Sequence, residues 1–151
     1  MPVIVTPGDL PELISFLRDV DVTLSGLDSS TVRVWIERNE AGVIVASTGF
    51  ELSENHEHAL IRSVAVRPSA QRVGEGTRLA PFALGMAAVC GARRAWLFSR
   101  RSGPFWRRLG FEGANRDHLA LGLGNTYQVR LFVESGQLDR EFAWSRALGS
   151  D

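Results

Sequence analysis

The sequence lacks several features that would assign it to common classes of protein. It has one cysteine, Cys90, in 151 residues, which excludes an intramolecular disulfide and a metal site built from cysteines. No apolar run approaches the ~18 residues of a membrane span, and the N-terminal residues lack the charged and apolar regions of a signal peptide. We therefore expect a cytoplasmic protein with no membrane partner, and we interpret Cys90 as a core thiol.

An excess of charge of one sign is also missing. Lys and Arg together number 17, as do Asp and Glu, so no overall basic field points to a nucleic-acid partner. Apolar residues, by contrast, make up 44% of the chain, which is typical of a globular protein with a core. At this length we expect a single domain spanning residues 1–151.

The apolar pattern predicts strands and helices in alternation. Short β-branched or alternating runs indicate strands at 3–5, 31–38, 43–50, 59–66, 95–99 and 126–133. Helical spacing indicates helices at 10–17, about 76 to 90, 103–109 and 138–148. Pro81 is tolerable in the second of these only if that helix starts late. This order favours a mixed sheet covered by helices.

The most informative stretch runs from Ile61 to Leu79. An apolar strand is followed by Gln71-Arg72-Val73-Gly74-Glu75-Gly76 and then by a segment that can be helical. Glycines let a backbone approach a ligand closely, and the N–H groups at a helix N-terminus favour phosphate. A Walker A loop is excluded because no Gly-Lys-Ser/Thr follows, and the third glycine of a Rossmann fingerprint is replaced by Leu79.

The remaining pattern, Gln/Arg-x-x-Gly-x-Gly/Ala between a strand and a helix, resembles the coenzyme A loop of the Gcn5-related N-acetyltransferase (GNAT) family. The stretch from Ser63 to Pro68 is similar to that family's central strand, and residues 95–99 and 105–111, which end in Leu-Gly-Phe, are similar to its next strand and helix. The resemblance implies an α/β (α+β) fold. This fold has a mixed, mostly antiparallel central sheet, a splay between its two middle strands, and helices on both faces.

The same resemblance implies which residues bind acetyl-CoA, the expected cosubstrate. The pantetheine arm is expected along the strand residues Val64, Ala65 and Val66. The pyrophosphate is expected on the loop and helix start, at Gln71, Arg72, Val73, Gly74, Glu75, Gly76 and Thr77. Glu75 departs from the family pattern, because a carboxylate facing a diphosphate is repulsive, so we expect it to point outward.

The catalytic half of the site is less well marked. Trp106 occupies the place, four residues before Gly110, where many family members have a tyrosine acid, and indole cannot donate a proton near neutral pH. The only tyrosine is Tyr127, on a predicted strand. For the general base we predict Glu51, just after the strand at 43–50, ahead of Glu54 and Glu57. The alternative is that all three are solvated loop carboxylates.

No metal is expected, because nothing completes a site around His56 and His58. For the acceptor we predict Arg62, a charge between apolar neighbours in a strand, which needs a partner. It binds either an anionic group of the substrate or Glu51. Arg116 is a second candidate. Trp35 and Trp106 are predicted to line the acceptor pocket, although aromatic residues are more often simply core.

One branch of the family fits more closely. Phe50-Glu51, the run from Leu60 to Val66, Trp106, and Gly110-Phe111 followed by Arg116-Asp117 are similar to arsenic-resistance N-acetyltransferases. The Cys-Pro-x-Ser usual near their end is absent. This branch implies direct transfer of an acetyl group to the primary amine of a small, anionic, amino-acid-like molecule.

Two other functions remain open at this point. The replacement of tyrosine by Trp106 is compatible with a non-catalytic acyl-CoA-binding or regulatory module. A peptide or protein N-terminal acetyltransferase would need an open groove instead of a closed pocket. The family also dimerises often through its late strands, so a homodimer is one of the states open to this chain.

Overall fold

The structure, a computed structural model, describes residues 2–20, 26–27, 29, 31–67, 75–100 and 102–148, without the side chains of residues 75–78. Its strands are β1 (Val3–Ile4), β2 (Val32–Arg38), β3 (Ile44–Leu52), β4 (His58–Val66), β5 (Arg94–Phe98), β6 (Glu112–Ala114) and β7 (Ala143–Ala147). The α-helices are α1 (Leu10–Asp19), α2 (Glu75–Val89), α3 (Gly103–Arg108), α4 (Arg116–Gly122) and α5 (Tyr127–Ser135). Two 3-10 helices, η1 (Pro7–Asp9) and η3 (Gln137–Arg140), complete them.

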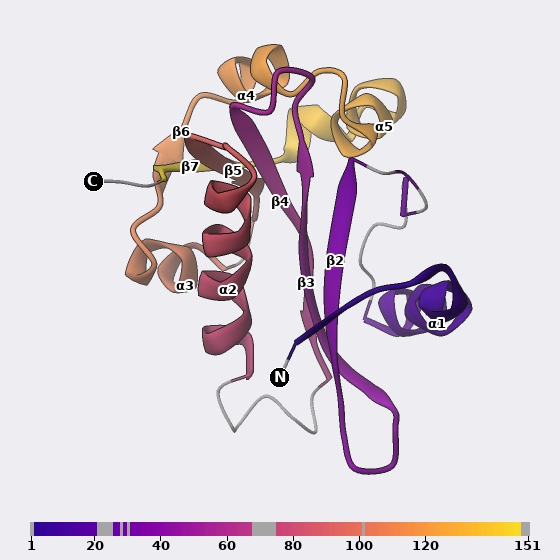
Figure 1. Ribbon diagram of the computed structural model, residues 1–151. Coiled ribbons are helices and arrows are strands. Elements are labelled where there is room, and N and C mark those ends of the chain that lie inside the picture. Colours follow the sequence, from indigo (N-terminus) through magenta and orange to yellow (C-terminus); the bar gives the residue numbers. More distant parts are fainter. Residues whose placement is uncertain are drawn as a thin grey trace.

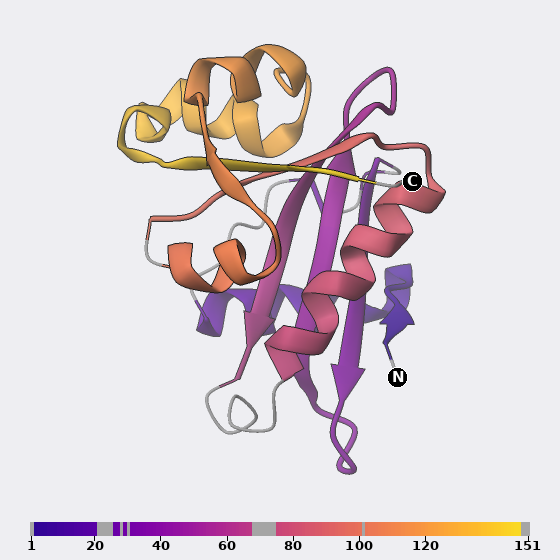
Figure 2. The ribbon, with the colours of Figure 1, turned by 90° about the vertical axis from the view of Figure 1, so that its left-hand side faces the viewer.

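The strands form one seven-stranded sheet in the order β1-β2-β3-β4-β5-β7-β6. Every neighbouring pair is antiparallel except β4 and β5, which are parallel. Helix α2 packs on one face of the sheet, while α1 and α5 lie on the other (Figure 1). The same two-sided arrangement is seen after a quarter turn, with α2 in front of the strands and α1 behind them (Figure 2). The expected mixed sheet with helices on both faces is confirmed.

The predicted splay in the middle of the sheet is also confirmed. Strand β4 pairs with β5 only where His58, Ala59 and Leu60 face Arg94, Ala95 and Trp96. Beyond Leu60, β4 continues to Val66 alongside β3 while β5 diverges from it. The two strands therefore form a wedge whose closed end lies near Leu60.

Strand β4 also has a β-bulge that the sequence pattern does not predict. Gly49 of β3 faces Arg62, and Ser47 faces Ala65, so two β4 residues stand opposite the single residue Thr48. Ser63 takes a positive φ of 59° there, a conformation that costs a non-glycine residue energy. The Ser47 hydroxyl donates to the Ser63 carbonyl at 2.6 Å, which satisfies the acceptor that the bulge displaces.

Most of the element predictions hold, but the C-terminal ones are wrong. Residues 126–133 form most of a helix, α5, instead of a strand, because the Thr126 side chain accepts from the Val129 N–H at its start. Gly136, at φ 78°, ends this helix in the left-handed region. The predicted helix at 138–148 is instead η3 followed by strand β7, which fits between β5 and β6.

Helix α2 begins at Glu75 and not late, so Pro81 lies inside it. Proline has no N–H to donate to the carbonyl of Thr77, and the helix tolerates this loss because tertiary packing outweighs local preference. Its buried residues Ala80, Leu84 and Ala87 belong to the same cluster as Phe50 and Ile61 of the sheet. Among the described residues, no helix is long and apolar enough to cross a membrane.

The close approach of β2 to β3 at Gly49 generates a stability prediction. A Cβ at this position would lie 2.5 Å from the Arg33 carbonyl oxygen, within the paired strands. We expect Gly49→Ala to lower the free energy of unfolding by more than about 2 kcal/mol, because the backbone must shift. Urea denaturation followed by circular dichroism measures this.

Gly85→Ala is the matched control. A Cβ there meets nothing within 4 Å, and alanine favours a helix interior by about 1 kcal/mol over glycine. The control should therefore be slightly more stable than wild type. Equal midpoints for the two variants would contradict the close packing at Gly49.

Candidate functional site

The candidate site centres on a buried ion pair between β3 and β4. Arg62 Nη1 lies 3.4 Å from Glu51 Oε1, and both side chains are 1% exposed. The two residues are diagonal neighbours on one face of the sheet, because Glu51 faces Leu60 and Gly49 faces Arg62. The prediction that Glu51 follows its strand is wrong, since β3 continues to Leu52 and Glu51 lies within it. Glu51 is therefore not a solvated loop carboxylate.

Glu51 also binds the start of α5, which is 76 residues away in sequence. Its Oε2 accepts from the Tyr127 N–H at 2.7 Å, and the carboxylate also accepts from the backbone N–H of Gln128. A carboxylate at a helix N-terminus satisfies free N–H groups and complements the helix dipole. Burial is the largest influence on this group and raises the pKa of Glu51, against the opposing effects of Tyr127 and Arg62.

Arg62 is incompletely satisfied. Its Nε lies 3.4 Å from the Ser63 hydroxyl, and its Nη1 pairs with Glu51. Among the described residues, the buried Nη2 has no hydrogen-bond partner. Burial lowers the pKa of Arg62, but a guanidinium stays protonated near neutral pH. A buried cation with a free donor is a site for an anionic ligand group.

The predicted coenzyme A residues lie in part outside the described residues. Gln71 to Gly74 are among those not described, and Glu75 to Thr77 form the first turn of α2. Because the side chain of Glu75 is not described either, its orientation stays a prediction. Helix α2 begins at the end of the sheet where β4 ends (Figure 1).

The strand that precedes this loop has a suitable shape for an extended amide chain. Val64, Ala65 and Val66 lie on the part of β4 beyond its pairing with β5. A strand segment released from one neighbour can hydrogen-bond an extended ligand along its edge. The wedge and the start of α2 therefore suit two neighbouring parts of coenzyme A, its pantetheine arm and its pyrophosphate.

The two tryptophans predicted to line the acceptor pocket lie on the other face of the sheet from Glu51 and Arg62. Trp35, 5% exposed, packs on Phe50 and Phe82 in the cluster between the sheet and α2. Trp106, 6% exposed, packs on Phe111 in the same cluster. Arg62 and Glu51 instead face α5, on the opposite side of the sheet. The structure thus brings Glu51 and Arg62 together but does not bring either tryptophan to them.

The remaining polar candidates have structural contacts. Arg116 donates to the carbonyls of Asp139 and Glu141 at 2.8 and 3.2 Å. His58 accepts from the Trp96 indole at 3.0 Å. In the part of the chain that the structure describes, no group of three or more His, Cys, Asp or Glu side chains is placed to hold a metal ion.

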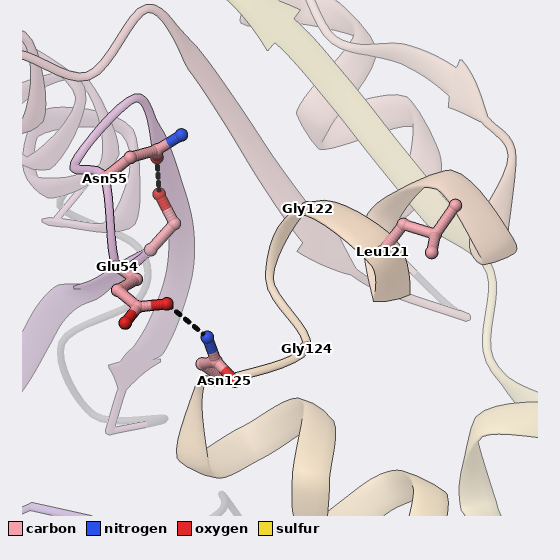
Figure 3. A pocket seen from close by; sticks show the side chains of 7 residues that line it. Glu54, Asn55, Leu121, Gly122, Gly124 and Asn125 are labelled. Atoms are coloured by element: carbon pink, nitrogen blue, oxygen red, sulfur yellow. Dashed lines mark hydrogen bonds between the residues drawn. The ribbon is translucent and has the colours of Figure 1, made fainter.

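A polar pocket of about 530 Å³ lies between the β3–β4 hairpin and the α4–α5 loop, and neither Glu51 nor Arg62 is among the residues that line it. Glu54 of the hairpin accepts from the Asn125 side chain at 2.9 Å, which joins the two loops (Figure 3). The Leu121 side chain on α4 lies away from this bond and is largely exposed. The bond links the segments that carry Glu51 and Tyr127, so it supports the contact between β3 and α5.

Comparison with known proteins identifies the family. The model of the acetyltransferase (GNAT) family matches residues 10–111, which is more than half of the chain. The chain therefore belongs to the acetyltransferase (GNAT) family, a class of acyltransferases whose cosubstrate is acetyl-CoA. A search of curated proteins found no match.

Solved structures share the fold at low sequence identity. An acetyltransferase of the GNAT family from Staphylococcus aureus Mu50 is 14% identical with a TM-score of 0.74, over 99% of this chain and 100% of that one. N-acetylglutamate synthase from Neisseria gonorrhoeae, complexed with coenzyme A and N-acetyl-glutamate, is 20% identical with a TM-score of 0.72. That match covers 99% of this chain but only 36% of the synthase. Tetrahymena Gcn5 is 14% identical with a TM-score of 0.71, over 99% and 96% of the two chains.

The raised pKa of Glu51 predicts a pH dependence of folding. The folded-state pKa lies above the ordinary value of about 4.3. The contribution of Glu51 to the free energy of unfolding is therefore fully present below that pH. It is lost as pH rises through the folded-state pKa. Glu51→Gln removes this titration, so the stability advantage of wild type over the variant should shrink as pH rises above about 4.3. Urea denaturation of both proteins at several pH values measures it.

The direction in which this stability difference changes with pH shows whether burial or the hydrogen-bonding partners have the larger effect on the pKa of Glu51. An advantage of wild type that grows with pH would mean that Arg62 and the α5 N–H groups outweigh burial. The pKa of Glu51 would then be lowered, which is opposite to the effect of burial. Glutamine keeps an oxygen that can accept from Tyr127, so α5 should remain capped in the variant.

Proposed function

We propose that this protein is an acetyl-CoA-dependent N-acetyltransferase that acts on the primary amine of a small, anionic, amino-acid-like molecule. The observation that carries the acceptor class is the buried Arg62 Nη2, which lacks a hydrogen-bond partner among the described residues. A carboxylate or a similar oxyanion would complete its bonding. The synthase from Neisseria, which shares the fold and was solved with coenzyme A and N-acetyl-glutamate, supports an acceptor of this kind.

For the cosubstrate, we propose binding along Val64, Ala65 and Val66 and on residues 71–77. The divergence of β4 from β5 beyond Leu60 and the helix start at Glu75 support this assignment. Bound acetyl-CoA would supply a thioester, whose carbonyl carbon the acceptor amine attacks directly. The C–S bond breaks as the C–N bond forms, the amine loses a proton, and the coenzyme A thiolate gains one.

Few side chains are candidates for taking the proton from the amine or for giving one to the thiolate. Glu51 remains our candidate base, because burial raises its pKa toward the working pH. Trp106 is buried in the core and supplies no acid, so the thiolate is protonated by water or another group. Trp35 and Trp106 would then affect the acceptor site only through packing.

Arg62→Lys tests the acceptor class. Lysine keeps the positive charge beside Glu51 but loses the fork of guanidinium donors. We expect the KM for carboxylate-bearing amines to rise about tenfold, since roughly 1.4 kcal/mol is lost with one charge-assisted hydrogen bond. The KM for the same amines without their carboxylate should not change. Thiol release from acetyl-CoA, measured across amino acids and their decarboxylated amines, gives these values.

Arg93→Lys, at an exposed position, is the matched control and should behave as wild type. Equal effects of Arg62→Lys on both sets of amines would refute an anion-binding role. Calorimetric binding of acetyl-CoA without turnover of any amine would favour a non-catalytic acyl-CoA-binding module. Turnover of peptides alone would favour an N-terminal acetyltransferase of peptides or proteins.

Glu51→Gln tests the base. If Glu51 takes the amine proton, kcat should fall about a hundredfold, and the acidic limb of the kcat–pH profile should disappear. If Glu51 only holds Arg62 and α5 in place, KM should rise and the limb should remain. Kinetics of the best acceptor between about pH 5 and pH 9 separate the two roles.

Three further assignments stay predictions. These are the cytoplasmic location, the arsenic-resistance branch of the family and the homodimer. The single domain spanning residues 1–151 is likewise a proposal from the sequence.

A further inference from the structure

Two residues that each have one polar atom without a hydrogen-bond partner both bond the same buried carboxylate. Among the described side chains, the buried polar atoms without a hydrogen-bond partner are Thr48 Oγ1, Arg62 Nη2 and Gln128 Oε1. Arg62 donates to Glu51 through Nη1, and Gln128 donates to Glu51 through its backbone N–H. Thr48 stands opposite Trp35 in the β2–β3 ladder and so faces α2 instead. Arg62, through its side chain, and Gln128, through its backbone N–H, therefore both bond the carboxylate of Glu51.

Of the two atoms without a partner, one is a hydrogen-bond donor and the other is an acceptor. Arg62 Nη2 is a donor with a positive charge, and Gln128 Oε1 is an acceptor. They do not bond each other, since both lack partners among the described residues. Buried polar groups are nearly always satisfied in native proteins, by protein, water or ligand. A molecule that carries an oxyanion and an N–H group would satisfy both.

The base of the Gln128 side chain is held firmly. Tyr127 and Gln128 begin α5, whose first turn is capped by Thr126 and by Glu51. The Tyr127 ring lies against Gly26, where a Cβ would clash with the ring. Because these contacts fix the backbone at the start of α5, a ligand can bind the Gln128 side chain without the cost of ordering a loop.

We propose that Gln128 is a specificity-determining residue of the acceptor site, whose Oε1 accepts an N–H of the molecule whose oxyanion binds Arg62 Nη2. The ligand class is an amino-acid-like zwitterion or its neutral-amine form. This assignment rests on the proposed function and adds to it a second recognition point on α5. An amine with no oxyanion, or an oxyanion with no N–H, would satisfy only one of the two atoms.

Gln128→Met tests the proposal, because methionine fills a similar volume without a polar group. We expect the KM for carboxylate-bearing amines to rise three- to tenfold, as for one lost hydrogen bond, while the KM for acetyl-CoA stays constant. The Tm should stay unchanged or rise, because replacing an unsatisfied buried polar atom by an apolar one removes a desolvation cost.

Glu134→Met, on the exposed side of the same helix, is the control and should change neither KM nor Tm. An unchanged acceptor KM in Gln128→Met would overturn the role of Gln128, even where Arg62→Lys still raises it. A lowered Tm together with equal changes in both KM values would show a structural role and overturn it too. Calorimetry adds a readout independent of turnover.

If wild type turns over no amine, the proposed function fails separately. The amino acids are then titrated into wild type and Gln128→Met, each saturated with coenzyme A. Weaker binding to the variant would still support the role of Gln128, and equal binding would overturn it.

Discussion

The contact on which the candidate site depends is the one between the Glu51 carboxylate and the first turn of α5. It joins the middle of the sheet to a helix that lies 76 residues later in the sequence. The same carboxylate pairs with Arg62 on the neighbouring strand, so three elements meet at one buried charge. Removing one partner of such a pair leaves an uncompensated charge, which costs more than the pair itself contributes. This arrangement fixes the positions of Arg62 and Gln128 relative to each other.

Apolar clusters cover both faces of the sheet, and one of these faces also carries the buried ion pair. On one face, α2 covers an apolar cluster that includes Trp35, Phe50 and Trp106. On the other face, polar groups from β3, β4 and α5 converge on Glu51. The wedge between β4 and β5 opens between the two faces, beside the bulge at Ser63 that directly follows Arg62. A cosubstrate in the wedge and an acceptor at Arg62 would therefore meet at neighbouring residues of β4, and each would have its own binding residues.

The errors in the sequence-based prediction have a common physical origin. Residues 126–133 include several β-branched and aromatic side chains, which favour a strand, yet Val129 and Phe132 are buried at helical spacing. The cap by Thr126 and the partners offered by Glu51 decided for a helix. The segment around Phe142 and Trp144 became a strand because β5 and β6 offered it two edges. In each case a partner distant in sequence overrode a weak local preference.

The order of the central elements, and a glycine-bearing segment between a strand and a helix, could be read from the sequence alone, because local spacing encodes these features. The sequence also identified the family, since its motifs lie in that same continuous region. It pointed to Arg62 as a residue that needs a partner, with Glu51 or an anionic substrate group as that partner, because a charge within an apolar strand must be compensated. Folding in three dimensions was needed to bring Glu51 to α5 and to place Trp35 and Trp106 on the opposite face. It also leaves Arg62 and Gln128 each with one polar atom that has no partner among the described residues. These outcomes depend on which faces meet after folding, and no local pattern carries that information.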